Sequence, residues 1–366
     1  MAFCSLVFAA EPAKDWPMWR FDAGRTAACG QDLPADLRLQ WERELPRPAP
    51  TYPNDPRMCF DRSYEPVAAG NRLFVPSMVT DSVTALDTAT GRELWTCFAE
   101  GPVRFAPVVR QDKVYFVSDD GFLYCVSASE GKLLWKFSPM GPDRRKQKLL
   151  GDERLISRWP ARGGPVLADG VIYFAAGVWP FEGVAVCAVD ASTGKPVWVN
   201  TECHFVKDGL LDHGDRRDGG LSPQGYLMVL GEKLIVPCGR ALPGVFDRAT
   251  GRMEPYTSGW GGRVALAKGS WYACGLGSWM FQSGDVYQVH PPEPATAAPK
   301  PGDCMPKCKC PVGLGAIRTL TAGGTVTILL TLEPTDAGLQ PLCGGKYRIL
   351  PKMPSKPHRA WHLSDW

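Results

Sequence analysis

The strongest constraint on how this 366-residue chain folds is a turn motif that recurs along its sequence. In each copy an Asp or Ser ends a short apolar run, a Thr-Gly or Glu-Gly pair follows, and a Trp stands four residues after the Gly. Three copies are complete, at residues 85–95, 125–135 and 188–198, and a fourth, at 245–253, keeps the turn but lacks the Trp. Self-similarity of this kind is typical of repeat architectures, in which one supersecondary unit is copied along the chain.

Each part of the motif has a physical role in a β-hairpin. The apolar runs, such as 82–86 and 122–126, are rich in β-branched and aromatic residues and predict strands. The Asp or Ser side chain accepts hydrogen bonds from backbone N–H groups two residues on, the Gly supplies a positive φ, and the Trp begins the next strand as a large apolar anchor. The residues to which we assign this structural role are Asp87, Gly91, Trp95, Gly131, Trp135, Asp190, Gly194, Trp198, Asp247 and Gly251.

A second hairpin is predicted upstream of each turn, because residues 66–75, 107–117, 165–174 and 226–236 each read as two apolar runs around a polar turn. Two hairpins make four strands, which is one blade of a β-propeller. Trp95 and Trp135 are 40 residues apart, a spacing that suits one blade. The third blade is expected to carry an insertion, whose basic run at 144–148 predicts a surface loop.

These motifs resemble the pyrroloquinoline-quinone-like (PQQ-like) β-propeller repeat. This family includes bacterial quinoprotein alcohol dehydrogenases and the non-enzymatic lipoprotein of the outer-membrane assembly machinery. The resemblance covers residues 15 to 290, including an opening segment, 15–22 with 37–41, that is similar to the start of bacterial members. It implies an all-β fold, a propeller of four-stranded blades. The four motifs and the strands expected near 263–266 and 285–289 indicate five or six blades, whereas family members close with seven or eight, so an incomplete propeller is one expectation.

The predicted organisation has four parts. Residues 1–10 are apolar and end in small residues, which predicts a truncated signal peptide and hence a periplasmic or otherwise extracytoplasmic protein, with a plain N-terminal strand as the alternative. Residues 11–290 form the propeller, 291–303 a Pro-rich linker, and 304–366 a Cys- and Pro-rich tail that is partly disordered or contributes one docked strand pair around 325–332. The tail is either native or the product of a truncated or frameshifted gene.

Composition excludes two classes of partner. The net charge is only +3, which gives no electrostatic basis for binding nucleic acid, and no apolar run approaches the roughly 20 residues of a membrane span. The 13 cysteines are odd in number, and Cys125 and Cys187 stand at apolar strand positions where they are expected to be buried hydrophobes. The cluster of Cys304, Cys308 and Cys310 is interpreted as incidental thiols in a flexible tail, with a zinc site as the alternative.

The resemblance also implies what an enzyme of this family would need. A quinoprotein dehydrogenase holds pyrroloquinoline quinone at the propeller's centre with calcium bound by Glu and Asn, an Asp base and a vicinal disulfide. This chain has no Cys-Cys pair, and its three Asn residues (Asn54, Asn71 and Asn200) lie in no acidic cluster. We therefore expect no catalytic residue, no metal and no cofactor, and keep a dehydrogenase using the quinone and calcium as the alternative. His204 and His213, among several Asp residues, are expected in a solvated loop between blades.

A binding function has more support in the sequence. Loops on a rigid frame tend to carry function, and several predicted loops mix Arg, Gln and Trp. Arg is a planar donor for carboxylate or phosphate. The residues expected to line a funnel on the loop face, for a protein partner or a small anionic ligand, are Arg158, Arg162, Gln224, Arg240 and Arg263. In the alternative, these arginines bind backbone carbonyls between blades. The sequence thus predicts a non-enzymatic, extracytoplasmic binding or scaffold module.

Overall fold

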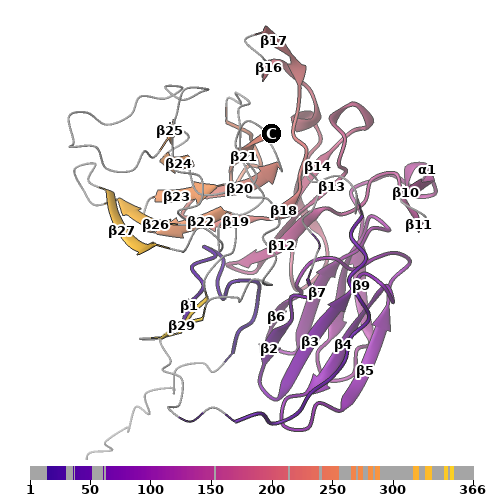
Figure 1. The fold of residues 1–366 in the computed structure, drawn as a ribbon. Coiled ribbons are helices and arrows are strands. Elements are labelled where there is room, and N and C mark those ends of the chain that lie inside the picture. Colours follow the sequence, from indigo (N-terminus) through magenta and orange to yellow (C-terminus); the bar gives the residue numbers. More distant parts are fainter. Residues whose placement is uncertain are drawn as a thin grey trace, which may run out of the picture.

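The computed structural model of the protein consists almost entirely of β-strands, arranged as a succession of small antiparallel sheets (Figure 1). It describes residues 15–29, 36, 38–51, 61, 63–151, 154–212, 215–238 and 241–254, together with the backbone of short strands between residues 265 and 349. All-β architecture with four-stranded sheets was the fold class predicted from the repeat, and the prediction is confirmed.

The first three blades are four-stranded antiparallel sheets in sequence order. Blade 1 consists of β2 (Val67–Ala69), β3 (Arg72–Ser77), β4 (Ser82–Asp87) and β5 (Glu93–Phe98). Blade 2 consists of β6 (Val108–Arg110), β7 (Lys113–Val117), β8 (Leu123–Ser127) and β9 (Leu133–Phe137). Blade 3 consists of β12 (Gly163–Ala168), β13 (Val171–Ala176), β14 (Ala185–Asp190) and β15 (Pro196–Asn200).

Blade 4 is less complete. It has β19 (Met228–Leu230), β20 (Lys233–Cys238) and β21 (Ala241–Asp247), and a single bridge between Phe246 and Met253 stands where the other blades have a fourth strand. The short strand β18 (Gly225–Tyr226), which precedes β19, pairs in parallel with β12 of blade 3. A further four-stranded sheet follows, made of β22 (Ala265–Lys268), β23 (Trp271–Cys274), β24 (Trp279–Gln282) and β25 (Asp285–Gln288).

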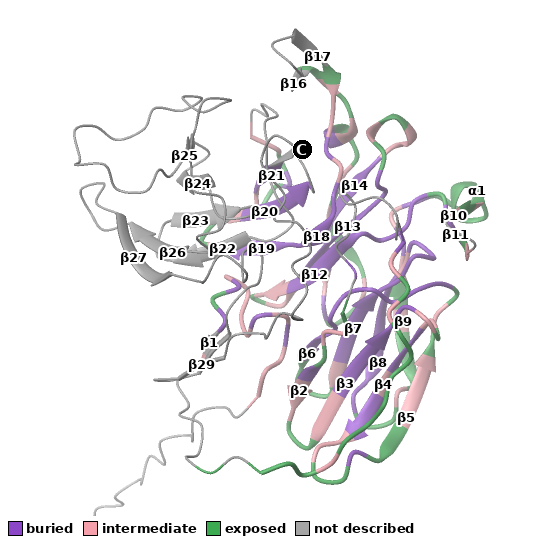
Figure 2. Cartoon of the chain, viewed as in Figure 1, coloured by how far each residue is buried: buried purple, intermediate pink, exposed green. Residues whose placement is uncertain are grey.

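The blades are arranged with their first strands together. β2 contacts β6, β6 contacts β12, and β12 contacts β19, so the first strand of each blade is the innermost one. Burial follows the same order: the first three strands of each blade are largely buried and apolar, whereas the fourth strands β5, β9 and β15 are mostly exposed or half-buried (Figure 2). This radial gradient is the geometry that a propeller requires.

The segments between and after the blades differ in part from expectation. The basic run predicted as a loop forms α1 (Pro142–Arg145) and the start of a hairpin, β10 (Lys148–Gly151) and β11 (Arg154–Ser157). The segment around His213 was expected as a loop but forms the hairpin of β16 (Val206–Asp212) and β17 (Asp215–Gly219). Two short 3-10 helices are η2 (Pro180–Glu182) and η3 (Glu202–His204).

The strand expected around 325–332 is present as β27 (Val326–Thr331), which pairs with β26 (Ala316–Leu320). A second C-terminal pair, β28 (Leu342–Gly344) and β29 (Tyr347–Ile349), joins β1 (Ala28–Cys29) from the N-terminal segment. The predicted signal peptide, the Pro-rich linker and the cluster of Cys304, Cys308 and Cys310 lie outside the described residues.

The predicted turn chemistry is present in the structure. The Asp87 carboxylate accepts hydrogen bonds from the Thr90 backbone N–H (2.9 Å) and hydroxyl (2.7 Å), and Gly91 follows with a φ of +68°. Asp190 accepts the same pair of hydrogen bonds from Thr193, and with those from Ser192 they lower the pKa of Asp190 to about 2. The turns at Asp87 and Asp190 are therefore fixed by a charged acceptor before the chain reverses, whereas in blade 2 the Ser127 hydroxyl accepts from the Glu130 backbone N–H at 3.3 Å.

The motif Trp residues act between blades rather than within one. The Trp95 ring lies on Gly131 of blade 2, so close that a Cβ at Gly131 would stand 2.5 Å from the ring, and the Trp95 indole N–H donates to the Ala128 carbonyl at 3.0 Å. Trp135 lies on Gly194 of blade 3 in the same way, and Trp198 lies on Gly251 of blade 4. We call each of these a Trp–Gly contact; together they join blades 1 to 4 in sequence order.

A fourth such contact begins the series and was not assigned from the sequence. Trp41, in the segment before blade 1, lies on Gly91, where a Cβ would stand 2.6 Å from its ring, and its N–H donates to the Thr88 carbonyl at 2.8 Å. Trp41 is not preceded by the turn motif, which is why the repeat pattern did not reveal this role.

Gly131→Ala should destabilise the protein by about 1–3 kcal/mol more than Gly231→Ala. Both glycines have a positive φ (+70° and +54°), so each alanine carries a similar backbone strain. Only at Gly131 does the new Cβ meet an indole, whereas Gly231 has nothing within 4 Å. Urea unfolding of both variants gives the difference, and equal free energies of unfolding would contradict the role of the Trp–Gly contact.

Trp95→Ala should cost about 1 kcal/mol more than Trp135→Ala, with each substitution costing about 3 kcal/mol or more. Both indoles are half-buried on a turn glycine, but the Trp135 N–H has no hydrogen-bond partner among the described residues. The carbonyl that corresponds to that of Ala128 belongs to Ala191, and it accepts from the Tyr115 hydroxyl instead. Equilibrium unfolding measures both; a larger loss for Trp135→Ala would show that the hydrogen bond is not what separates them.

Candidate functional site

The sequence-predicted funnel residues lie in different environments. Arg158 is exposed, 3.3 Å from the Glu182 carboxylate, with its guanidinium over the Trp159 ring. Arg162 and Gln224 are buried, at 1% and 4% exposure. Arg240 and Arg263 lie outside the described residues, so the complete funnel stays a prediction, and the described members do not share one open surface.

Arg162 belongs to a buried cluster of two arginines and two aspartates, which we call the Arg–Asp cluster. Its guanidinium lies 2.8 Å from the Asp119 carboxylate, which also accepts from Arg104 at 2.7 Å, and Arg104 in turn lies 2.6 Å from Asp61. The four side chains are almost fully buried and their charges balance. Ion pairs of this kind cost several kcal/mol when one member is removed, because a buried charge is left uncompensated.

The elements that supply these residues explain the position of the Arg–Asp cluster. Arg104 and Arg162 stand just before β6 and β12, the innermost strands of blades 2 and 3, and Asp119 follows β7. The cluster also holds the segment before blade 1, because Arg104 donates to the Ala49 carbonyl (2.9 Å) and Arg162 to the Thr51 hydroxyl (2.8 Å). Its hydrogen-bond capacity is used to fix a loop onto two blades.

A second cluster, of aromatic rings, lies between the same inner strands. Trp19 stacks on Tyr226 with ring centroids 4.1 Å apart, and Phe105 meets the Tyr226 ring edge-on at 5.1 Å. The Tyr226 hydroxyl donates to the Glu65 carboxylate and accepts from the Ala106 backbone N–H at 2.6 Å. Tyr226 thereby joins blade 4 to the segments that begin blades 1 and 2.

Arg25 completes this aromatic cluster. Its fully buried guanidinium donates to the carbonyls of Trp19, Pro165 and Leu227, each at 2.8 Å, and lies over the Tyr226 ring. Burial lowers the pKa of Arg25 to about 10, so it stays cationic at neutral pH. Arg25 is an instance of the alternative that the sequence left open, an arginine that satisfies backbone carbonyls between blades.

Glu65 is the titratable group of the aromatic cluster. The residue keeps some exposed surface, but its carboxyl is desolvated, and this burial raises the pKa of Glu65 to about 7. Hydrogen bonds from Tyr226 and Trp19, and the charge of Arg25, oppose the rise without cancelling it. Glu65 therefore changes protonation close to neutral pH.

The described centre does not fit a quinone cofactor with calcium. The space between the inner strands holds the stacked Trp19–Tyr226 pair, and the Asp61 and Asp119 carboxylates are bonded to arginines, which repel a divalent cation. Among the residues that the structure describes, no three His, Cys, Asp or Glu side chains are grouped as metal ligands. No step of a quinone reaction can be derived from these residues.

Other candidates are accounted for by local structure. The His204 ring faces the Thr201 carbonyl at the end of blade 3, and His213 lies outside the described residues. Cys125 and Cys187 are fully buried, as predicted, and burial raises the pKa of both thiols. They behave as small apolar side chains.

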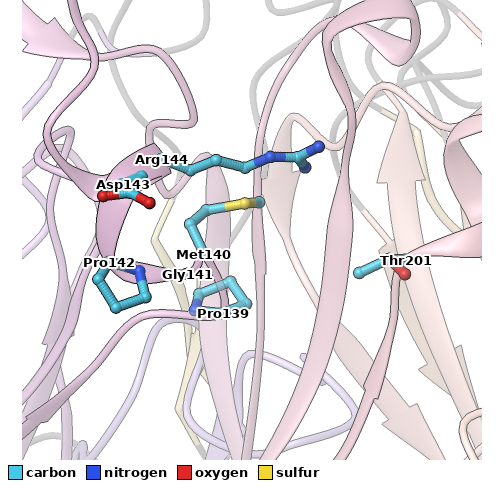
Figure 3. Close-up of a pocket in the computed structure, with 7 residues that line it drawn as sticks. All are labelled: Pro139, Met140, Gly141, Pro142, Asp143, Arg144 and Thr201. Atoms are coloured by element: carbon cyan, nitrogen blue, oxygen red, sulfur yellow. The ribbon is translucent and has the colours of Figure 1, made fainter.

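The insertion between blades 2 and 3 forms a surface hollow that the sequence did not reveal. It has a volume of about 450 Å³, and Met140 and Arg144 extend from one wall towards Thr201 on the other (Figure 3). Its lining residues are Pro139, Met140, Gly141, Pro142, Asp143, Arg144 and Thr201. The Arg144 guanidinium also lies 5.4 Å from the Trp159 ring, and Asp143 adds an acidic residue to the lining.

Comparison with known proteins identifies relatives of two kinds. Residues 6–198 match a family model described as the outer membrane protein assembly factor BamB. The dehydrogenase subunit of a quinone alcohol dehydrogenase from Komagataeibacter europaeus is 32% identical over 147 residues, which cover 35% of this chain and 19% of that protein. A polyvinylalcohol dehydrogenase from Sphingopyxis sp. (strain 113P3) is 27% identical over 179 residues, covering 46% and 24%. The chain thus spans a quarter or less of these curated relatives.

Solved structures show the same fold. A europium-containing methanol dehydrogenase aligns with a TM-score of 0.51 at 15% identity, covering 77% of this chain and 58% of that one. A quinohemoprotein alcohol dehydrogenase from Comamonas testosteroni aligns with a TM-score of 0.50 at 16% identity, covering 75% and 48%. In the described part of the chain, no helix has the length and apolar character needed to cross a membrane.

The stability of the protein should fall as the pH rises from about 4.5 to about 7. The folded state holds the Glu65 proton up to a pKa of about 7, whereas the unfolded chain releases it near the ordinary glutamate pKa of 4.5, so the folded state binds more protons in this window. Glu65→Gln should remove up to about 3 kcal/mol of this decline. Urea unfolding at pH 5, 6, 7 and 8 measures it; parallel pH profiles for the two proteins would show that Glu65 is not the titrating group.

Proposed function

The chain belongs to the family of PQQ-like repeat propellers described as the outer membrane protein assembly factor BamB, and from this premise we propose that it is a non-enzymatic binding module that holds a protein partner. The proposal includes an extracytoplasmic location, which the name of that family model supports. It also includes the absence of a resident cofactor. The propeller is then a rigid frame, and its surface loops and strands are what the partner contacts.

The proposal rests on one observation: the polar groups near the inner strands form hydrogen bonds and ion pairs with one another. In a propeller that binds a ligand at its centre, donors and acceptors there must be available to that ligand. Here Arg104 and Arg162 are bonded to aspartates, and Tyr226 is bonded to Glu65 and stacked on Trp19. The described centre is a packed polar core, which suits a frame better than a ligand-binding cavity.

The outer surface supports a protein partner over a small anion. Large apolar side chains are exposed on the insertions, notably Phe181 (83%), Leu150 (74%) and Leu155 (61%). Leu150 and Leu155 lie opposite each other in the β10–β11 hairpin, and neighbouring exposed apolar groups are typical of protein-binding surfaces. By contrast Arg158, the exposed member of the predicted funnel, already faces Glu182, which lowers its availability to an anionic ligand.

The second candidate is a dehydrogenase that uses pyrroloquinoline quinone and calcium. The names of the curated relatives, which are dehydrogenases, favour it, but this chain covers a quarter or less of those proteins. The residues between the inner strands disfavour calcium binding, because arginines are paired with the buried carboxylates that would have to bind the ion. The two candidates therefore differ in a measurable property, the binding of the quinone.

Pyrroloquinoline quinone with calcium should leave the melting temperature unchanged. A ligand that binds only the folded state stabilises it, by about 2.7 kcal/mol at 100 times its Kd. Differential scanning fluorimetry with the quinone and calcium, each alone and together, measures this, with a quinoprotein alcohol dehydrogenase as the positive control. A saturable rise of several degrees that needs both ligands would overturn the proposal in favour of the dehydrogenase.

A further inference from the structure

The hollow beside α1 lies between the ends of two outer strands. Pro139 stands two residues after β9, the fourth strand of blade 2, and Thr201 directly follows β15, the fourth strand of blade 3. The insertion that contains α1, β10 and β11 projects from the blades at this point (Figure 1). The volume of about 450 Å³ lies in the range of about 300–1,000 Å³ that is typical of binding pockets, so the hollow has room for a bulky side chain.

The insertion carries as much net charge as the whole chain. Residues 143–158 contain six basic and three acidic residues, a net charge of +3, and the complete 366-residue chain also carries +3. The charges of all remaining residues therefore balance. Positive charge that is concentrated on one surface element attracts an anionic partner and speeds its association.

Three consecutive cations of the insertion are available to such a partner. Arg144, Arg145 and Lys146 are exposed, and none of them forms an ion pair with a carboxylate of the described residues. The other three cations are already paired with acidic residues of neighbouring segments: Lys148 with Glu100, Arg154 with Asp81, and Arg158 with Glu182. The Arg144 side chain reaches across the hollow towards Thr201 (Figure 3).

The β10–β11 hairpin adds an apolar surface to the same insertion. Leu150 and Leu155 lie opposite each other and are both exposed. The neighbouring pair, Leu149 and Ile156, lies on the other face of the hairpin, where Ile156 is buried. By the same alternation Lys148 shares the outward face with Leu150. The hairpin therefore buries one face and presents two leucines beside a cation on the other.

Charge and shape together specify the occupant. Unpaired cations require carboxylates or phosphates opposite them, and exposed leucines require apolar groups. An anionic membrane offers both, but a flat lipid surface does not enter a hollow between α1 and Thr201. An acidic protein segment with a large apolar side chain matches the cations, the leucines and the hollow at once.

We propose that residues 139–150, with Leu155 and Thr201, form an acidic-segment site. Carboxylates of the partner protein lie against Arg144, Arg145 and Lys146, and one of its large apolar side chains fills the hollow. This inference rests on the proposed function as a protein-binding frame and names the chemistry of the partner. The site has a fixed base, because Arg145 donates to the Met140 carbonyl at 2.7 Å.

The test uses the full-length protein and a short fluorescein-labelled peptide in which Asp and Glu alternate with Leu and Phe. Fluorescence anisotropy at about 50 mM salt should give saturable binding with a Kd of about 100 μM or tighter. Replacing the acidic residues of the peptide by Asn and Gln, or its Leu and Phe by Ser, should each weaken binding by about fivefold or more. Raising the salt to about 500 mM should also weaken it, because exposed charges are screened.

Two matched double variants locate the charges that bind. Arg144→Gln with Lys146→Gln should weaken peptide binding by about five- to tenfold. Lys132→Gln with Lys195→Gln removes the same charge from exposed positions just before β9 and β15, at the strand ends opposite the hollow, and should change the Kd by less than about twofold. All four side chains are exposed, so both proteins should keep the wild-type melting temperature.

A second pair of variants tests the hollow without changing charge. Gly141 is a lining residue with a φ of −61°, and a Cβ there would meet nothing within 4 Å, so substitution is tolerated. Gly141→Phe places a ring at the hollow and should weaken peptide binding by about fivefold or more, because it competes with the apolar side chain of the peptide. Gly141→Ala leaves the space open and should bind as the wild type does.

Four outcomes would overturn the inference. The first is the absence of saturable peptide binding up to about 1 mM. The second is an equal loss in the two double-charge variants, which would leave only a general effect of net charge. The third is unchanged binding by Gly141→Phe. The fourth is binding to phosphatidylglycerol vesicles, lost in the Arg144→Gln and Lys146→Gln protein, without binding of the peptide, which would assign the surface to a membrane. None of these results bears on quinone binding, so the proposed function is tested separately.

Discussion

The structure depends on the contact between an indole and a glycine of the next blade. A turn glycine with positive φ has no Cβ, so the flat face of a Trp ring can lie against its backbone, as Trp95 does on Gly131. The indole N–H then fixes the orientation of the ring by donating to a carbonyl of the same turn. Each Trp–Gly contact joins two neighbouring blades only, and Tyr226 near the inner strands adds links between blades that are not neighbours.

The local part of this fold was predictable from the sequence because its causes are local. An Asp that accepts from the N–H groups of the following residues, and a Gly that adopts positive φ, need no distant partner, so the turns at Asp87 and Asp190 were predicted correctly. The direction of the Trp side chain was not predictable in this way. Whether an indole packs within its hairpin or on the next blade depends on how the sheets stack, and that is a tertiary property.

The candidate site was likewise only partly predictable from the sequence. The sequence predicted that Arg162 and Gln224 line a funnel on the loop face, and it did not indicate that both are buried. The sequence alone does not distinguish an arginine that binds an anionic ligand from an arginine that pairs with a buried aspartate. The difference is decided by Asp119 and Asp61, which the fold brings to Arg104 and Arg162 from separate segments. A propeller centre filled in this way gains order from its charges and leaves none of the paired groups free for catalysis.

The geometry of the Trp–Gly contact also explains how a segment that forms no strand is held in place before blade 1. Within a blade, a strand is held by hydrogen bonds along its edges; between blades, it is held by side chains that project from its face. Trp41 and Arg43 use only the second kind of contact, since both bind the turn of blade 1. The two kinds of contact point in different directions, so the hydrogen bonds along the edges can be absent while the side-chain contacts between blades are complete. Blade 4 is the converse case: Pro255 stands in the sequence where a motif Trp is expected, and up to residue 254, where this described stretch ends, the turn is followed by the bridge from Phe246 to Met253. Within the described residues, the series of contacts thus runs from Trp41 on blade 1 to Trp198 on blade 4.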